Sequence, residues 1–268
     1  MEIEIRVKWF ALWGALLLLA SISLLIGTTG FSFPSLSDPT SMTLFWEFRF
    51  PRTMAALLVG ASLGLSGLLL QSLTRNAIAE PFTLGVSGGA TLGTVAAILV
   101  QSSVFSTFFG ALFGGLVTCA IVYLVVRKSQ NQENSLVLSG LMITFFCGSV
   151  ITLLYSFLSP YQLQSAIYWM IGQLGTERDL SWPVLAAVLF PALLVALMKS
   201  KELDRLYVDR RLLKYKESHL LYVFVILAVG LVTSASVAIS GLIAFVGLAS
   251  PHLGRMYFDV QMHRQKIV

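Results

Sequence analysis

The sequence predicts an all-α, polytopic transmembrane helix bundle, and composition, the length of the apolar runs and the placement of the charges all support this. Of the 268 residues, 56% are hydrophobic and only 12% are charged, whereas a soluble domain carries about 25% charged residues. A soluble globular domain therefore lacks the charges for its surface, and a disordered chain would be far more polar. We expect one transmembrane domain over residues 1–268.

Apolar runs recur along the chain, and most are close to the ~20 residues that a helix needs to cross a bilayer. Backbone groups in lipid must be satisfied within their own segment, so each run is expected to be a helix. The first run is expected to be a retained helix, because no small-residue cleavage site of a signal peptide follows it. The about eight predicted spans are 9–27, 53–73, 84–103, 107–126, 136–158, 182–198, 219–240 and a shorter run at 242–258.

The positive charges predict the orientation of these spans. If the N-terminus is cytoplasmic and all eight runs cross, only Arg49, Arg52 and Arg178 lie outside, and every other Lys and Arg lies inside. Cytoplasmic loops of membrane proteins carry this excess of Lys and Arg. The net charge of +5 is thus explained by the topology in a lipid bilayer, and no nucleic-acid partner is expected.

The sequence shows no pattern typical of catalysis. His219, His252 and His263 are scattered, and Cys119 and Cys147 lie inside apolar runs. We therefore expect no catalytic residue, no metal site and no cofactor, and the chain is not expected to be an enzyme. Span interiors also lack obvious charges, which usually mark ion or proton pathways, so an ion-coupled secondary transporter is disfavoured.

Small residues are concentrated at two places. The stretch Gly60–Leu68 resembles Thr233–Leu242, and the two run in opposite directions in the predicted topology. This relation indicates an inverted repeat, as many transporters have, although chance similarity in small-residue apolar sequence remains an alternative. A second cluster, Gly85–Gly93, follows the polar turn Thr74–Pro81 and indicates either a broken helix or tight helix packing.

Several of these motifs together resemble a known family. They are Arg49–Arg52, Ala55–Leu63, Ser66–Gln71, Arg75–Asn76, Ala79–Pro81, Leu84–Ala90, Trp169–Leu174, Ser240–Leu248, Ser250–His252 and Arg255. Their order and spacing resemble the permease subunit of bacterial ABC importers for iron–siderophores, haem and cobalamin, the FecCD or vitamin B12 type. The resemblance extends from about residue 45 to residue 258.

The resemblance implies the ABC importer permease fold of the vitamin B12 type, in the bacterial cytoplasmic (inner) membrane. It implies a homodimer with a translocation path, separate cytoplasmic ATPase subunits that supply the energy, and an extracytoplasmic substrate-binding protein that delivers a metal-chelate ligand. Compared with the family, the last two spans are expected to be missing from this sequence.

The resemblance also assigns roles to residues. Arg49 and Arg52 are expected to contact the binding protein. The path or the packing of the dimer is expected to involve Gly67, Gln71, Asn76, Gly85, Gly88, Gly89 and Gly241. Coupling to the ATPase is expected in the cytoplasmic loop 199–218, at Leu203, Leu206, Tyr207, Asp209 and Arg210.

The coupling loop departs from the family pattern. Residues 203–217 lack the Leu-Gly pairs of the family and are more basic. A basic helix lying on anionic lipid is therefore an alternative for this segment. At the level of the protein, the alternative to a transport permease is a diverged, non-transporting membrane subunit.

Overall fold

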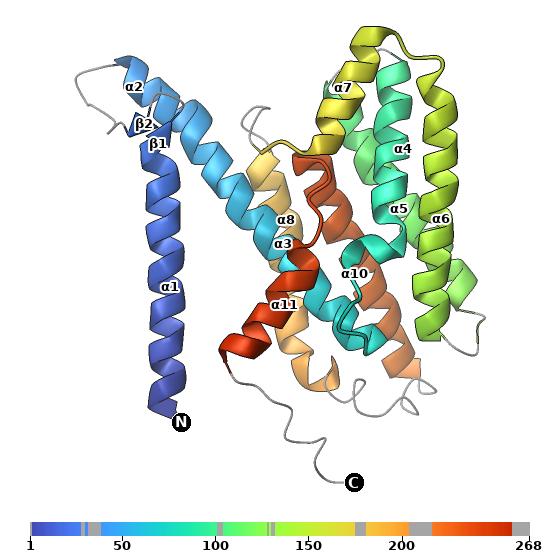
Figure 1. Ribbon diagram of the computed structural model, residues 1–268. Coiled ribbons are helices and arrows are strands. Elements are labelled where there is room, and N and C mark those ends of the chain that lie inside the picture. Colours follow the sequence, from blue (N-terminus) through green and yellow to red (C-terminus); the bar gives the residue numbers. More distant parts are fainter. Residues whose placement is uncertain are drawn as a thin grey trace.

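The computed structural model describes residues 2–27, 30–31, 39–100, 104–127, 129, 132–174, 181–203 and 216–258. Within these ranges the chain is a bundle of helices with one minimal hairpin (Figure 1). The helical elements are α1 (Glu2–Leu25), α2 (Pro39–Leu44), the π-helix η1 (Phe45–Arg49), α3 (Phe50–Thr74), the 3₁₀-helix η2 (Pro81–Leu84), α4 (Val86–Leu99), α5 (Val104–Val126), α6 (Gln132–Tyr155), α7 (Pro160–Ile171), α8 (Ser181–Met198), α10 (Lys216–Ser240) and α11 (Val246–Tyr257). The hairpin pairs β1 (Ile26–Gly27) with β2 (Gly30–Phe31) in antiparallel register, Ile26 opposite Phe31.

Helices α3 and α10 form the centre of the bundle. Two-thirds of the apolar window of α10 and half of that of α3 are buried. Helix α10 packs against α3, α5 and α8, and α4 packs against α5 and α6. Helix α1 stands apart on the far side of α3 (Figure 1).

The largest core cluster lies around the ends of α3, α5 and α6 and the first half of α10. Leu70, Leu84, Val122, Leu136 and Ile226 are all almost fully buried in it. Smaller apolar clusters continue the core along α10 toward α4, α5 and α8. Burial in this bundle is therefore greatest where helices from both halves of the sequence meet.

The predicted all-α transmembrane bundle is confirmed, and its spans need refinement. Five described helices, namely α1, the helical stretch ending with α3, α5, α6 and α10, are long and apolar enough to cross a membrane, and α4 and α8 are shorter apolar helices. The predicted eighth span at 242–258 is only the 12-residue α11, which at 1.5 Å per residue is about 18 Å long. It is too short to cross as a straight helix.

Helix α7 was not predicted from the hydropathy of the sequence. Its start is fixed by a capping box, in which the side chains of Ser159 and Gln162 each bond the other's backbone. The Nε2 group of Gln162 also donates to the carbonyl oxygen of Ile98, at the end of α4, over 2.9 Å. Gln162 therefore links α7 to α4, and the buried Ala166 packs with Val95 of α4 and Ile151 of α6.

Candidate functional site

The chain leaves α-helical geometry at two places beside the central helices. The first is the segment 75–85 between α3 and α4, and the second is the segment 241–245 between α10 and α11. Figure 1 shows the second segment returning into the bundle before α11 begins. Non-helical backbone at membrane depth is tolerated only where protein buries it or where it lines a cavity, so these segments are candidates for function.

Both short helices that follow the breaks begin at a residue in the left-handed region. Gly85 precedes α4 with a φ of 77°, and Phe245 precedes α11 with a φ of 68°. A phenylalanine rarely adopts this conformation, because its Cβ crowds the following carbonyl group. A contact from elsewhere must therefore hold Phe245 in place.

Glu80 supplies that contact. Its Oε1 accepts a hydrogen bond from the backbone N–H of Phe245 over 2.6 Å, across 165 positions of sequence. A carboxylate at the beginning of a helix satisfies a free N–H group and interacts favourably with the positive end of the helix dipole. The polar turn after α3 thus fixes the start of α11.

A second polar contact joins the other end of α11 to α3. The Nη2 group of Arg255 donates to Oε1 of Gln71 over 2.7 Å. The Nε2 group of Gln71 faces the carbonyl oxygen of Leu248 at 3.4 Å. Only 4% of the Gln71 surface is exposed, so its amide is shielded from solvent where it meets α11.

Between these contacts the two helices cross with almost no space. A Cβ atom at Gly67 would collide with the carbonyl oxygen of Gly247, and one at Gly64 would lie 2.9 Å from Oγ of Ser250. Small residues at such crossings let helix backbones approach closely. Gly67, Gln71, Glu80, Gly247 and Arg255 therefore form one contact, which we call the α3–α11 junction.

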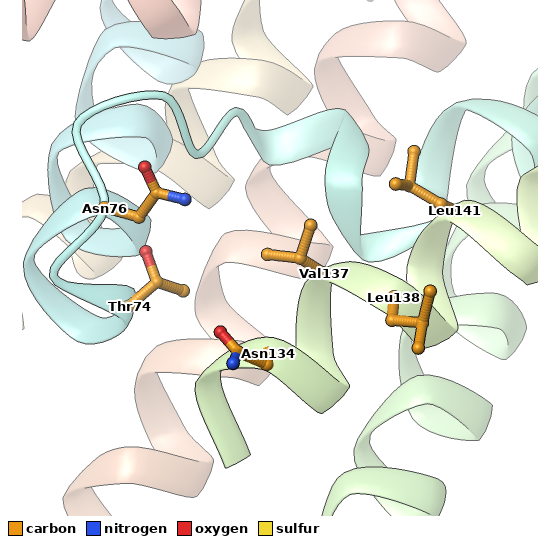
Figure 2. Close-up of a pocket in the computed structure, with 6 residues that line it drawn as sticks. All are labelled: Thr74, Asn76, Asn134, Val137, Leu138 and Leu141. Atoms are coloured by element: carbon orange, nitrogen blue, oxygen red, sulfur yellow. The ribbon is translucent and has the colours of Figure 1, made fainter. Parts of the chain in front are cut away.

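A cavity opens near the end of α3. It has a volume of about 210 Å³ and is lined by Thr74, Asn76, Asn134, Val137, Leu138 and Leu141. Figure 2 shows Thr74 and Asn76 on one wall and the α6 residues on the other. The amide oxygen of Asn76 accepts from the N–H of Ile78, and the Thr74 hydroxyl donates to Leu70 of its own helix.

This cavity is too small to hold a large chelate. Pockets for drug-sized ligands have volumes of roughly 300–1,000 Å³, and cobalamin or a ferric siderophore exceeds a drug in size. Thr74 and Asn76 form one wall, and α6 contributes the polar Asn134 together with the apolar Val137, Leu138 and Leu141. The described residues around the cavity therefore offer a surface and not a complete site for such a ligand.

The other glycines that the sequence singled out lie at contacts within this chain. A Cβ at Gly88 would lie 2.9 Å from Cα of Thr144, and one at Gly89 would collide with Thr118 and the Gly114 carbonyl. Gly241 has a φ of 69° and lies against the carbonyl of Trp169. A Cβ added at Gly85 would lie 3.3 Å from the carbonyl oxygen of Gly140. Asn76 is the one predicted path residue that lines the cavity.

The two arginines predicted to contact the binding protein lie at the start of α3, Arg49 as the last residue of η1 and Arg52 in the first turn of α3. Arg52 is exposed, while Nη1 of Arg49 donates to the carbonyl of Leu24 in α1 over 3.3 Å. Of the predicted coupling residues, Leu203 packs against the largest core cluster. Leu206, Tyr207, Asp209 and Arg210 lie outside the described residues, as does most of the loop 199–218.

Sequence reasoning gave no role to Glu80, Phe245 or Arg255. The signal was present for two of them, because Glu80 and Arg255 are charged residues inside the motifs that carry the family resemblance. A charge next to an apolar run needs a partner, and a search for opposing polar residues would have led to Gln71. Nothing in the sequence marks Phe245.

Comparison with known proteins agrees with this arrangement. The model of the FecCD transport family matches residues 11–268. The vitamin B12 import system permease protein BtuC of Escherichia coli O17:K52:H18 is 33% identical over 260 residues, covering 94% of this chain and 78% of the relative. The protein of the same name from Vibrio cholerae serotype O1 is 32% identical over 254 residues, covering 92% and 76%.

A solved structure is also similar. It is described as an inward-facing conformation of a metal-chelate type ABC transporter, and it matches with a TM-score of 0.82 and 32% identity, over 94% of this chain and 81% of that one. Family model, relatives and structure agree over nearly the whole chain. The protein therefore belongs to the FecCD transport family and is a membrane permease of the ABC importer type.

Proposed function

We propose that the chain forms half of the translocation path of a binding-protein-dependent importer for a cobalamin-type or iron-chelate ligand. The observation that supports this most strongly is the 33% identity to a vitamin B12 permease across 94% of the chain. The similar solved structure carries a metal-chelate description. Both point to a large chelated ligand, and cobalamin is the first candidate, with siderophores and haem next.

The path is proposed to lie between two copies of the chain. The described cavity is open and small, and α6 exposes large apolar side chains beside it, including Met142, Phe145 and Phe146. Exposed apolar surface next to a polar cavity fits a partner copy better than lipid alone. In a homodimer the two cavities and the two α6 helices face one another across the path.

The energy is proposed to come from two cytoplasmic ATPase subunits, and the ligand from an extracytoplasmic binding protein. Permease subunits of this type are not themselves enzymes. In the described residues, Glu80 and Arg255 are engaged in the α3–α11 junction, so they are not free to act as carriers of protons or ions. This favours an external energy source over a secondary transporter.

The N-terminus is proposed to be cytoplasmic in the bacterial inner membrane. In Figure 1 the start of α1 and the last turns of α3 and α5 lie at the end of the bundle that carries the N-terminus, and the start of α3 lies at the opposite end. Arg6 and Lys8 belong to the first turns of α1, and Arg75 and Arg127 directly follow α3 and α5, whereas Arg49 and Arg52 lie at the start of α3. The positive-inside tendency then places the first group in the cytoplasm.

Uptake by whole cells tests the proposal. The chain is expressed with candidate ATPase and binding-protein partners in a bacterium that lacks its own vitamin B12 and siderophore permeases. Cyanocobalamin, ferric siderophores and haem are offered singly, with growth under iron limitation as a second readout for the iron compounds. We expect ATP-dependent accumulation of one of them.

The diverged, non-transporting subunit is the second candidate, because residues 203–217 lack the family's Leu-Gly pairs. It predicts no accumulation of any compound, even when an ATPase co-purifies with the chain. Accumulation that persists after ATP depletion and stops when the proton gradient is collapsed would instead contradict the ABC mechanism.

A further inference from the structure

Helices α7 and α10 end against each other (Figure 1). The backbone N–H of Gln173, two residues after the end of α7, donates to the carbonyl oxygen of Ser240, the last residue of α10, over 2.8 Å. The final carbonyl groups of a helix have no partner within that helix, and at membrane depth the protein itself must supply one. Gln173 therefore caps α10 from a distant part of the sequence.

Two glycines make this contact close. Gly172 has a φ of 84° and Gly241 a φ of 69°. A Cβ added at Gly241 would collide with the carbonyl oxygen of Trp169 and would lie 2.9 Å from Cα of Gly172. A Cβ added at Gly172 would lie 3.2 Å from the carbonyl oxygens of both Ser240 and Leu242. Both positions therefore need glycine, for the backbone conformation and for the close approach of the two chain segments.

The non-helical segment 241–245 is held at both of its ends. The contact of residues 172–173 with residues 240–241, which we call the clasp, holds its start. At the other end the N–H group of Phe245 donates to the carboxylate of Glu80. Four Cα–Cα steps of ~3.8 Å each separate the two ends, so the segment has little slack. A displacement at the clasp therefore reaches the start of α11.

Helix α7 is anchored to a different part of the bundle by contacts outside the clasp. The Nε2 group of Gln162 donates to the carbonyl oxygens of Ile98, over 2.9 Å, and of Leu99, over 3.4 Å, at the end of α4. The Tyr155 hydroxyl at the end of α6 donates to Sδ of Met170 over 3.0 Å. Because a helix is a rigid element, α7 links the ends of α4 and α6 to the clasp.

We infer that α7 positions α11 through the clasp and the segment 241–245. The link runs from the ends of α4 and α6, along α7, to the end of α10 and then to Phe245. It adds a third support to α11, beside the two hydrogen bonds of the α3–α11 junction. Figure 1 places α7 at the end of the bundle opposite the N-terminus. That this end faces the binding protein rests on the proposed function, whereas the link itself does not.

Hydrogen exchange in the full chain, purified in detergent micelles, tests the clasp. The amides of Leu248 and Ala249 in the first turn of α11 both donate to the carbonyl oxygen of Phe245, so they report whether this turn is formed. Gly172→Ala places a residue with a Cβ in a sparsely populated backbone conformation, and we expect these two amides to exchange about tenfold faster. Gly148→Ala on α6, where an added Cβ would meet nothing within 4 Å, should leave them unchanged.

A pair of glutamine variants tests α7 without altering the clasp. Gln162→Ala removes the capping box and the hydrogen bonds to the end of α4. Gln164 is exposed, and its amide faces the Tyr168 hydroxyl of the same helix at 3.5 Å. We expect Gln162→Ala to accelerate exchange at Leu248 and Ala249 roughly threefold, the effect of one lost hydrogen bond, and Gln164→Ala to have no effect. Equal rates in the two glutamine variants would overturn the inference, even if the glycine variant did not fold.

The double variant Gly172→Ala with Glu80→Ala tests whether the segment connects its two supports. If the supports act in series through one short segment, either substitution releases it and the second adds little. We expect exchange at Leu248 and Ala249 in the double variant to stay near that of the faster single variant, below the product of the two single effects. Acceleration equal to the product would show that the two supports act independently, which contradicts the inference.

Exchange around Val122 distinguishes a local effect from general destabilisation. Val122 is buried in the largest core cluster, so its amide and those beside it should exchange equally slowly in Gly172→Ala and in the unmodified chain. Equal acceleration there and in α11 would mean that the whole bundle is loosened, and the inference would be wrong. These measurements do not require transport, so their failure is distinguishable from a failure of the proposed function.

Discussion

Arg255 and Gln71 are 184 positions apart in sequence and share a hydrogen bond of 2.7 Å. The guanidinium group belongs to the short helix α11 and the amide to the central helix α3. This bond, together with the one from the Phe245 N–H group to Glu80, holds α11 at both ends. Between them, Gly247 of α11 packs against Gly67 of α3. The half-length helix is thus positioned by side chains of α3 and of the turn that follows it, and not by its own insertion across the bilayer.

Replacing Gln71 should loosen α11. Gln71→Ala leaves Arg255 without its acceptor and removes the amide facing Leu248, and an unsatisfied, partly buried polar group costs about 1–3 kcal/mol. We expect a lower unfolding temperature of the purified protein in detergent micelles. Ser72→Ala is the control, because the Ser72 hydroxyl bonds only the Leu68 carbonyl of its own helix. Equal destabilisation by the two variants would contradict the role of the junction.

Glu80 can be tested by separating its charge from its acceptor oxygen. Glu80→Gln retains an oxygen for the Phe245 N–H group, whereas Glu80→Ala removes it and should cost about 1 kcal/mol, the usual value of a helix cap. We expect the amides in the first turn of α11 to exchange hydrogen faster in the alanine variant than in the glutamine variant. Identical exchange in both would show that the side chain does not hold the start of α11.

The long helices were predictable from sequence, and the junction was not. Runs such as Leu220–Ser240 are apolar throughout, so hydropathy alone marks them. Helix α7 escaped this test because Gln162 and Gln164 interrupt its apolar pattern. Hydropathy predicts one span over 242–258, because it does not report that the backbone at Phe245 adopts a left-handed conformation, which Glu80 stabilises from a distant part of the chain.

The sequence predicts that the glycines allow close packing, but not which residues pack against them. The sequence predicted that Gly67 and Gly88 lie at close contacts, in the path or between protomers. In the structure their close neighbours are Gly247 and Thr144 of the same chain. The spacing of small residues in the sequence shows where another helix can approach closely. Only the tertiary structure shows which helix packs there.

Gly88→Leu should abolish transport without preventing insertion. The added Cβ would lie 2.9 Å from Cα of Thr144 and 3.2 Å from Cβ of Cys147, so α4 and α6 must separate. Quantities in the membrane are measured by immunoblot and transport by uptake of the accepted compound. Gly148→Leu, placed on α6 where no atom of this chain is within 4 Å, should insert equally well without separating α4 from α6. Normal uptake by Gly88→Leu would contradict the structural contact.

Arg52→Glu should weaken docking of the loaded binding protein. Arg52 is exposed at the start of α3, and interfacial charges of this kind mainly steer association and fix its register. We expect a slower association rate at low salt, by about tenfold, in binding measured on immobilised permease. Arg75→Glu, at the other end of α3, is the matched control.

Arg49→Glu combines two effects, because Arg49 also donates to the Leu24 carbonyl and so helps to hold α1. We therefore expect it to lower stability as well as docking, in contrast to Arg52→Glu. If the association rate of Arg52→Glu equals that of the unmodified protein at low salt, the arginine lies at the lipid headgroups, where long basic side chains extend toward phosphate.

A cysteine at Tyr207 tests coupling to the ATPase. The sequence predicts one helix face from the apolar Leu203, Leu206 and Leu213 and the aromatic Tyr207 and Tyr215, and such a face suits a groove on a partner protein. The same segment is basic, and each Lys or Arg near anionic lipid is worth about 1 kcal/mol, so a lipid-bound helix is the alternative. We expect Tyr207→Cys to crosslink to a co-expressed ATPase subunit, more strongly when ATP is bound. Cysteine substituted at Arg127, another predicted cytoplasmic position, reports crosslinking by proximity alone. Labelling of Tyr207→Cys by lipid-embedded probes, without a crosslink, would remove the coupling role and support a non-transporting relative.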